Sequence, residues 1–170
     1  MKEMKKNNKG FTLLELLVVV LIIGILAAIP QPQYKKSDEK ARMSEAVLLV
    51  RQIAEMHQLY YLVNGEYLRP NDIDKLDITI PGTKIQTGDR RLLTTYFLYS
   101  PNASGGSGDE WLAYAWRIKD NKESTNLNSN RIYSIYIEQS KPNKIICRCN
   151  SLCSNIQKAL CRELNDNGTL

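Results

Sequence analysis

Apolar residues form one uninterrupted stretch near the start of the chain. Residues 11–29 read FTLLELLVVVLIIGILAAI, and Glu15 is the only charged side chain among them. At about 1.5 Å per residue, a helix of this length spans roughly 28 Å, which is close to the apolar thickness of a bilayer. The pattern therefore predicts a helix over 11–29 that crosses a membrane.

The segment in front of this stretch is basic. Four lysines stand against one glutamate: Lys2, Lys5, Lys6, Lys9 and Glu3. This excess of positive charge predicts that the N-terminus stays in the cytoplasm and that the residues after 29 lie on the other side of the membrane. An ordinary secretory signal peptide, with its small residues at Ala27 and Ala28, is the alternative interpretation.

A second helical pattern follows two prolines. Pro30 and Pro32 lack an amide donor and disfavour helical geometry in the residue before them, so we expect a kink or melted stretch over 30–34. The apolar spacing then predicts an amphipathic helix over 35–63. Its main stripe is Ala46, Val47, Val50, Ile53, Ala54, His57, Tyr60 and Tyr61. Leu49, Met56, Leu59 and Val63 lie off the stripe, so a second apolar side would face either neighbouring subunits or the same domain.

The pattern changes after residue 82 to alternating, β-branched and aromatic runs. These runs predict strands over 92–99, 111–118, 131–137 and 145–149. The polar, glycine-rich linkers between them favour antiparallel connections. We therefore predict an α+β fold in which a long N-terminal helix, half transmembrane and half amphipathic, packs on an antiparallel sheet of about four strands.

The start of the apolar stretch resembles the N-terminal signature of type IV pilins and type II secretion pseudopilins. The residues that carry the resemblance are Gly10, Phe11, Thr12, Leu13, Leu14 and Glu15, followed by LLVVVLIIGILAAI. The resemblance is closest over 9–42. Pro32 stands where the family usually has a proline, whereas Pro30 stands where the family's helix usually continues without interruption. It implies a leader of residues 1–10, cleavage after Gly10 by a prepilin peptidase that also N-methylates Phe11, and an outward, pilin-like domain over 30–170.

Glu15 is then the fifth residue of the processed chain. A carboxylate and the new α-amino group of Phe11 are each costly in a dry, helix-packed environment unless they pair. The resemblance implies that Glu15 meets the amino terminus of a neighbouring subunit, so that copies of this chain and related pilins assemble into a helical filament. A merely local role at the positive end of its own helix is the alternative.

Processing also changes the charge. Removal of residues 1–10 takes away four lysines and one glutamate, which lowers the formal net charge from +5 to +2. The charge therefore gives no reason to expect a nucleic-acid partner. The linkers 100–110 and 119–130 are the candidate surface if the chain is a minor pilin that binds a surface, DNA or a secretion substrate.

Four cysteines lie in the last quarter of the chain: Cys147, Cys149, Cys153 and Cys161. An exported domain meets oxidising conditions, so all four are candidates for disulfides. Cys147 and Cys149 lie too far apart along a strand for an easy bond, and each is expected to pair with Cys153 or Cys161. The spacing is not that of a familiar zinc site, and we expect no metal there.

No motif indicates catalysis or a cofactor. His57 is the single histidine and lies on an apolar stripe, so we expect a hydrogen-bonded core residue. The acidic cluster Asn71, Asp72, Asp74 and Asp77 lacks the pattern of a calcium loop and is expected to cap a turn. The sequence thus predicts a structural filament subunit, anchored by a single pass in the bacterial inner membrane before assembly. The sequence does not decide whether the filament is a pilus or a pseudopilus, or whether the chain is a major or a minor subunit.

Overall fold

Among the residues that the structure describes, six antiparallel strands follow one another across the sheet in the order of the sequence. They are β1 (Lys84–Ile85), β2 (Leu92–Leu93), β3 (Phe97–Pro101), β4 (Trp111–Ile118), β5 (Arg131–Glu138) and β6 (Ile145–Cys149). The computed structural model describes residues 10–28, 31–69, 72–80, 84–85, 91–101, 111–119 and 130–170. The linkers 102–110 and 120–129, the leader residues 1–9, and Pro30 and Asn71 lie outside the described residues.

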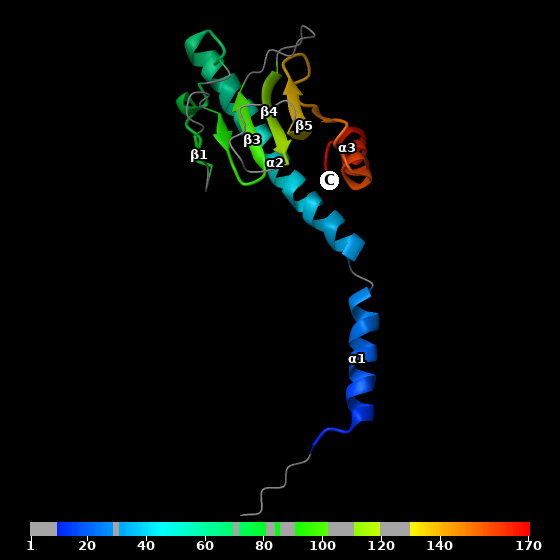
Figure 1. Ribbon diagram of the computed structural model, residues 1–170. Helices are drawn as coiled ribbons and strands as arrows, with labels where there is room; N and C mark the ends of the chain where they lie inside the picture. Colours follow the sequence, from blue (N-terminus) through cyan, green and yellow to red (C-terminus); the bar gives the residue numbers. More distant parts are fainter. Residues whose placement is uncertain are drawn as a thin grey trace, which may run out of the picture. The chain divides into compact units, whose positions relative to one another are not determined.

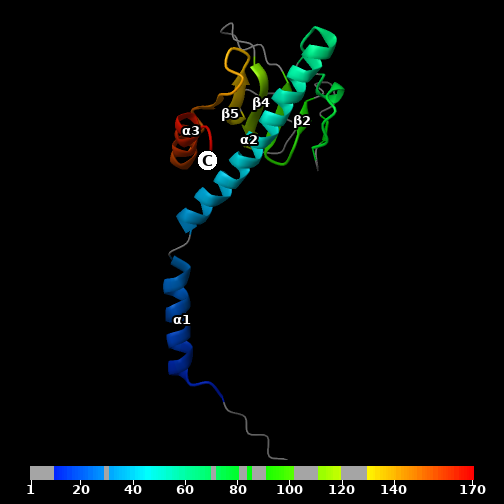
Figure 2. The same ribbon diagram turned by 180° about the vertical axis from the view of Figure 1, so that it is seen from behind.

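The described part of the chain also forms four helical elements (Figure 1). They are the helices α1 (Leu13–Ala28), α2 (Gln31–Asn64) and α3 (Asn155–Asn167), and the 3-10 helix η1 (Ile73–Lys75). The chain divides into two units, residues 1–37 and 38–170. In the second unit, α2 lies across one face of the sheet (Figure 2), which confirms the predicted α+β fold.

The sheet has more strands than the predicted four. The stretch 92–99, predicted as one strand, folds as the hairpin of β2 and β3, in which Leu93 pairs with Leu98. The turn is closed by Thr94, whose backbone amide donates to the carbonyl of Phe97 at 2.8 Å and whose hydroxyl accepts from the Phe97 amide at 3.1 Å. Thr94 is β-branched, like the residues typical of strands, and it closes the turn with its own hydroxyl. From the sequence, residues 92–99 therefore look like one continuous strand.

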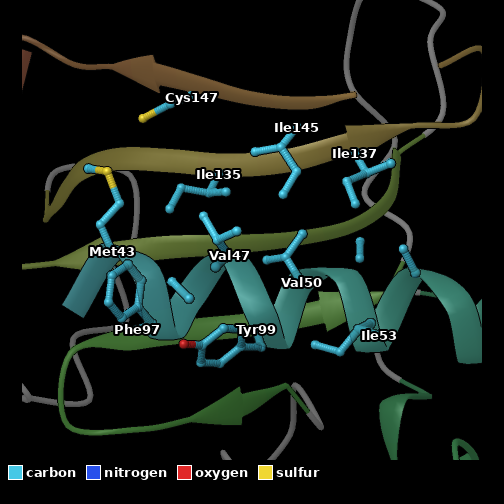
Figure 3. Packing of buried hydrophobic residues seen from close by; sticks show 14 of the residues in the cluster. Met43, Val47, Val50, Ile53, Phe97, Tyr99, Ile135, Ile137, Ile145 and Cys147 are labelled. Atoms are coloured by element: carbon cyan, nitrogen blue, oxygen red, sulfur yellow. The ribbon is translucent and has the colours of Figure 1, made fainter. Parts of the chain in front are cut away.

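Helix α2 buries the predicted stripe from Ala46 to His57, whereas Tyr61 at the end of the stripe is exposed. Figure 3 shows its side chains pointing at those of β3, β5 and β6: Met43, Val47, Val50 and Ile53 face Phe97, Tyr99, Ile135, Ile137 and Ile145. Each fully buried aliphatic side chain contributes roughly 1.5–3 kcal/mol. The opposite side of the helix is different, because Leu48, Leu59, Leu62 and Val63 are all exposed. Of the predicted second apolar side, Leu49 and Met56 are partly buried against the core, whereas the described residues leave Leu59 and Val63 exposed.

The prolines affect the helices less than predicted. Helix α1 ends at Ala28 and α2 begins at Gln31, so Pro32 falls in the first turn of α2, where no amide donor is needed. The prolines were expected to push Ile29 and Gln31 toward extended geometry, and this is wrong for Gln31, which is helical, as are Gln33 and Tyr34. Ile29 and Pro30, between the two helices, lie outside the described residues.

Helix α3 was not predicted from the sequence. Ser154 caps its start by accepting from the amide of Gln157, whose side-chain oxygen accepts from the amide of Ser154 in return. This is a capping box, formed here with glutamine. The helix ends at Gly168, which adopts the left-handed conformation at φ 71°. Leu160 and Leu164 are fully buried by its packing beside β6.

Candidate functional site

The residues of the N-terminal signature stand at the start of α1. Gly10, Phe11 and Thr12 precede the helix and are exposed. Thr12 donates twice to Oε2 of Glu15, from its backbone amide at 2.9 Å and from its hydroxyl at 2.8 Å. The Glu15 amide donates back to the Thr12 hydroxyl at 3.3 Å. In the single chain, Thr12 and Glu15 therefore cap the start of α1 through hydrogen bonds with each other.

The rest of α1 presents apolar side chains on every side. Residues 13–27 are all exposed, and Phe11 before them is 82% exposed. A helix that is apolar all round is stable only where other apolar groups surround it. Among the residues that the structure describes, no helix meets the combined length and hydropathy expected of a membrane span.

Comparison with known proteins identifies the N-terminal residues. Residues 5–29 match the family model of the prokaryotic N-terminal methylation motif. The chain carries this motif. It covers Gly10, Phe11 and Glu15, the residues on which the resemblance to pilins and pseudopilins was recognised.

Three relatives of the chain are pilus and secretion proteins. The chain is 44% identical over 64 residues to the Fimbrial protein of Neisseria meningitidis serogroup B, a match that covers 38% of each chain. It is 41% identical over 68 residues to the Type IV major pilin protein PilE1 of Neisseria gonorrhoeae, which covers 40% of this chain and 41% of that one. It is 36% identical over 64 residues to the Type II secretion system core protein G of Dickeya chrysanthemi, covering 38% and 42%.

These matches confirm the resemblance, but they cover only part of each chain. The chain spans about two fifths of the length of the curated relatives it matches. The relatives are named as pilus subunits and a secretion-system protein, and none of these names describes an enzyme.

Two disulfides lie near the C-terminal end of the domain that follows the methylation motif. Cys147 of β6 is bonded to Cys161 of α3, with Cα atoms 5.1 Å apart. Cys149, at the end of the same strand, is bonded to Cys153 in the turn before α3, with Cα atoms 5.8 Å apart. Both pairs belong to the set that the sequence left open.

A buried ion pair joins α2 to the sheet, and the sequence analysis missed it. The guanidinium Nε of Arg117 on β4 donates to Oε1 of Glu39 at 3.2 Å. The hydroxyl of Tyr133 donates to the same oxygen at 2.9 Å, and the side-chain amide of Gln157 donates to it at 3.2 Å. Burial raises the pKa of Glu39, but the hydrogen bonds and charge of Arg117, with the bonds from Tyr133 and Gln157, outweigh burial and leave the pKa lowered.

The remaining candidates have structural roles. His57 is fully buried and hydrogen-bonded, which confirms the prediction of a core histidine. Asp72 stands at the N-cap of η1 but makes no capping hydrogen bond with its side chain, so the predicted capping role is wrong for this residue. It forms an ion pair of 3.2 Å with Lys75 instead. Among the described residues, no group of histidine, cysteine and acidic side chains is arranged to hold a metal ion.

Proposed function

We propose that the chain is a structural subunit of a type IV pilus-like filament, cut after Gly10 by a prepilin peptidase that then methylates Phe11. The methylation motif over residues 5–29 carries this proposal. The chain is organised as a leader of residues 1–10, an assembly helix over 11–29 and an outward domain over 30–170. Before assembly, residues 11–29 lie in the inner membrane with the leader in the cytoplasm, and the filament afterwards stands in the periplasm or on the cell surface.

The geometry of Glu15 supports assembly through α1. Both Thr12 donors bind Oε2, and the hydrogen bonds described within residues 10–28 leave Oε1 unused. Cleavage creates an ammonium group on Phe11, and an ammonium in an apolar bundle needs an anion. The exposed apolar surfaces of α1 form such a bundle when copies pack side by side. Oε1 of Glu15 in one copy then accepts a hydrogen bond from the Phe11 ammonium group of the next copy.

The processing step is tested by intact-mass and N-terminal analysis of protein extracted from membranes. We expect a chain that begins at methylated Phe11, and we expect Gly10→Val to leave the leader attached. The same chain lengths in the wild type and the variant would contradict cleavage after Gly10. A chain that begins near Pro30 would instead indicate an ordinary signal peptide.

The assembly step is tested by Glu15→Gln, which keeps the size and the hydrogen-bonding oxygen of the side chain but removes its charge. Leaving the Phe11 ammonium unpaired in the bundle costs several kcal/mol, so the yield of filaments should fall by at least about tenfold, while membrane levels of the subunit are unchanged. Glu45→Gln, at an exposed position of α2, is the matched control and should assemble normally. Wild-type yield from Glu15→Gln would contradict the proposed pairing.

A pseudopilin of a type II secretion system is the second candidate, favoured by the match to core protein G of Dickeya chrysanthemi. Deletion of the chain distinguishes the two functions. Loss of filaments sheared from intact cells supports a pilus, and loss of exoprotein secretion with filaments retained supports a pseudopilus.

A further inference from the structure

The imidazole of His57 holds two backbone segments to α2. The ring is fully buried, and its Nε2 atom accepts a hydrogen bond from the amide of Leu68, a few residues after the helix. Its Nδ1 atom bonds to the carbonyl of Leu112 on β4. A backbone amide only donates and a carbonyl only accepts, so the bond to Leu68 requires that Nε2 carries no proton.

The residues that follow α2, 65–69 and 72–80, are called here the post-helix segment. Backbone hydrogen bonds within it join residues close in sequence: Leu76 donates to Ile73 at 3.1 Å, and Ile78 donates to Leu76 at 2.8 Å. Such bonds shape the segment without attaching it to a helix or to the sheet. The bond from Leu68 to His57 is of the other kind, because it ties the segment to α2.

A groove runs between α2 and part of the post-helix segment. It consists of two hollows of about 200 and 280 Å³, and both are lined by Met56 of α2 and Asp77 of the segment. The segment therefore packs incompletely on the helix, although Leu68 and Leu76 are buried in the core. Parts of a fold with few buried contacts open at a lower free energy than its core, so the tie at Leu68 has a large effect here.

The surroundings of His57 do not favour a charged ring. Burial lowers its pKa, and the bond with Leu112 raises the pKa by a smaller amount. Tyr67 contacts the ring, with centroids 5.0 Å apart, and a phenol is neutral in acid. The charged residues described near the ring in sequence or on its bonded elements are Glu55, Glu66, Arg69, Asp72, Asp74, Lys75, Asp77 and Arg117. None of these residues contributes to the pKa of His57.

We propose that His57 is an acid-sensitive latch, which releases the post-helix segment from α2 when Nε2 takes up a proton from water. The charged ring carries a donor on both nitrogens. Its Nδ1 atom still donates to Leu112, in a bond that the charge strengthens. Its Nε2 atom and the amide of Leu68 are then two donors that face each other, so this bond is lost. The helix stays attached to β4 while the segment detaches, and return to neutral pH restores the bond.

Hydrogen exchange of the Leu68 amide in the full chain in detergent micelles tests the latch. Once the pH dependence of exchange itself is corrected for, protection at Leu68 should fall at least about tenfold between about pH 7.5 and about pH 5, on either side of the ordinary histidine pKa. The amide of Asn150, which donates to Ile132 at 2.9 Å, is the control and should keep its protection because β5 and β6 stay paired.

Two results of the exchange experiment would overturn the proposal. Unchanged protection at Leu68 would mean that acid does not break its bond to His57. An equal loss at Leu68 and Asn150 would mean that the whole domain opens, rather than the post-helix segment alone.

Nitrogen NMR of the wild-type ring identifies the group that takes up the proton. Nε2 should change from an acceptor to a protonated nitrogen with the same midpoint as the loss of protection at Leu68, while Nδ1 stays protonated throughout. A ring that remains neutral while Leu68 loses protection would assign the release to another group. This measurement needs no substitution, so it decides the question even if a variant of His57 fails to fold.

Two substitutions separate His57 from the carboxylates of the segment. His57→Gln offers one acceptor and one donor but does not titrate, so protection at Leu68 should no longer depend on pH. Glu66→Gln, at an exposed position two residues before Leu68, is the matched control and should keep the dependence of the wild type. A pH dependence that persists in His57→Gln, or disappears in Glu66→Gln, would contradict the latch.

Discussion

The Nε2 atom of His57 accepts a hydrogen bond of 2.8 Å from the backbone amide of Leu68. The Nδ1 atom lies 2.8 Å from the carbonyl oxygen of Leu112. Since Leu68 supplies a donor and Leu112 an acceptor, the imidazole is neutral with its proton on Nδ1. One buried ring thus joins α2 to the start of β4 and to the segment that follows α2.

This arrangement predicts a pH-dependent stability. Burial lowers the pKa of His57, against a smaller opposite effect of the Leu112 carbonyl. Between the folded pKa and the ordinary value of about 6.5, the unfolded chain binds a proton that the folded chain does not. The contribution of His57 to the free energy of unfolding is therefore at its maximum above about pH 6.5 and falls as the pH decreases below that value. Urea unfolding of the wild type and His57→Gln on both sides of this pH tests the effect, and an identical pH dependence in both would contradict it.

The pair of Glu39 and Arg117 should contribute far more than its exposed neighbour. Glu39→Gln leaves a buried guanidinium without its counter-charge, which costs roughly 3–5 kcal/mol of unfolding free energy. Asp38→Asn is the control one residue away. It breaks a 2.7 Å ion pair with Arg42, which at a partly exposed helix surface contributes at most about 1 kcal/mol. Similar urea midpoints for the two variants would show that the buried pair contributes no more to stability than the exposed pair.

The two disulfides should differ in their contribution to stability. Cys147 and Cys161 are 14 residues apart in sequence, and Cys149 and Cys153 are 4 apart. By chain entropy alone, the longer loop corresponds to about 3 kcal/mol and the shorter to about 2 kcal/mol. Denaturant unfolding of the two double-serine variants measures both values. A larger loss from the shorter loop would rule out chain entropy as the main source of stabilisation.

The helix cap at Thr12 gives a fourth prediction. Thr12→Val keeps the shape of the side chain but removes the hydroxyl that binds Glu15 in both directions, at an expected cost of about 1 kcal/mol. The Glu15 amide should then exchange about fivefold faster in the full chain in detergent. Thr12→Ser retains the hydroxyl and should exchange like the wild type. Equally fast exchange in the serine variant would assign the effect to the threonine methyl group.

The sequence predicted those parts of the structure in which one local pattern decides the outcome. The stripe from Ala46 to His57 could be read from its spacing because a single helix face packs on a single sheet face. Strands β4, β5 and β6 are rich in aromatic and β-branched residues or cysteine and appear close to their predicted ranges.

The missed features depend on partners that are distant in the sequence. Glu39 and Arg117 are 78 residues apart, and each alone looks like an ordinary surface charge. Helix α3 had a local signal, Ser154 followed three residues later by Gln157, which the pattern of cysteines obscured. Attention to capping residues would have found the helix, but not its contact with Glu39.

Both tryptophans of the chain lie on β4, on the face of the sheet turned away from α2. Trp111 stacks on Tyr136, with ring centroids 4.3 Å apart, and the guanidinium of Arg131 lies 3.5 Å from the centre of the Trp116 ring. Intrinsic tryptophan fluorescence therefore reports on this outer aromatic layer alone, whereas circular dichroism reports on the helices. Coincident melting curves from the two signals would mean that both layers unfold as one cooperative unit.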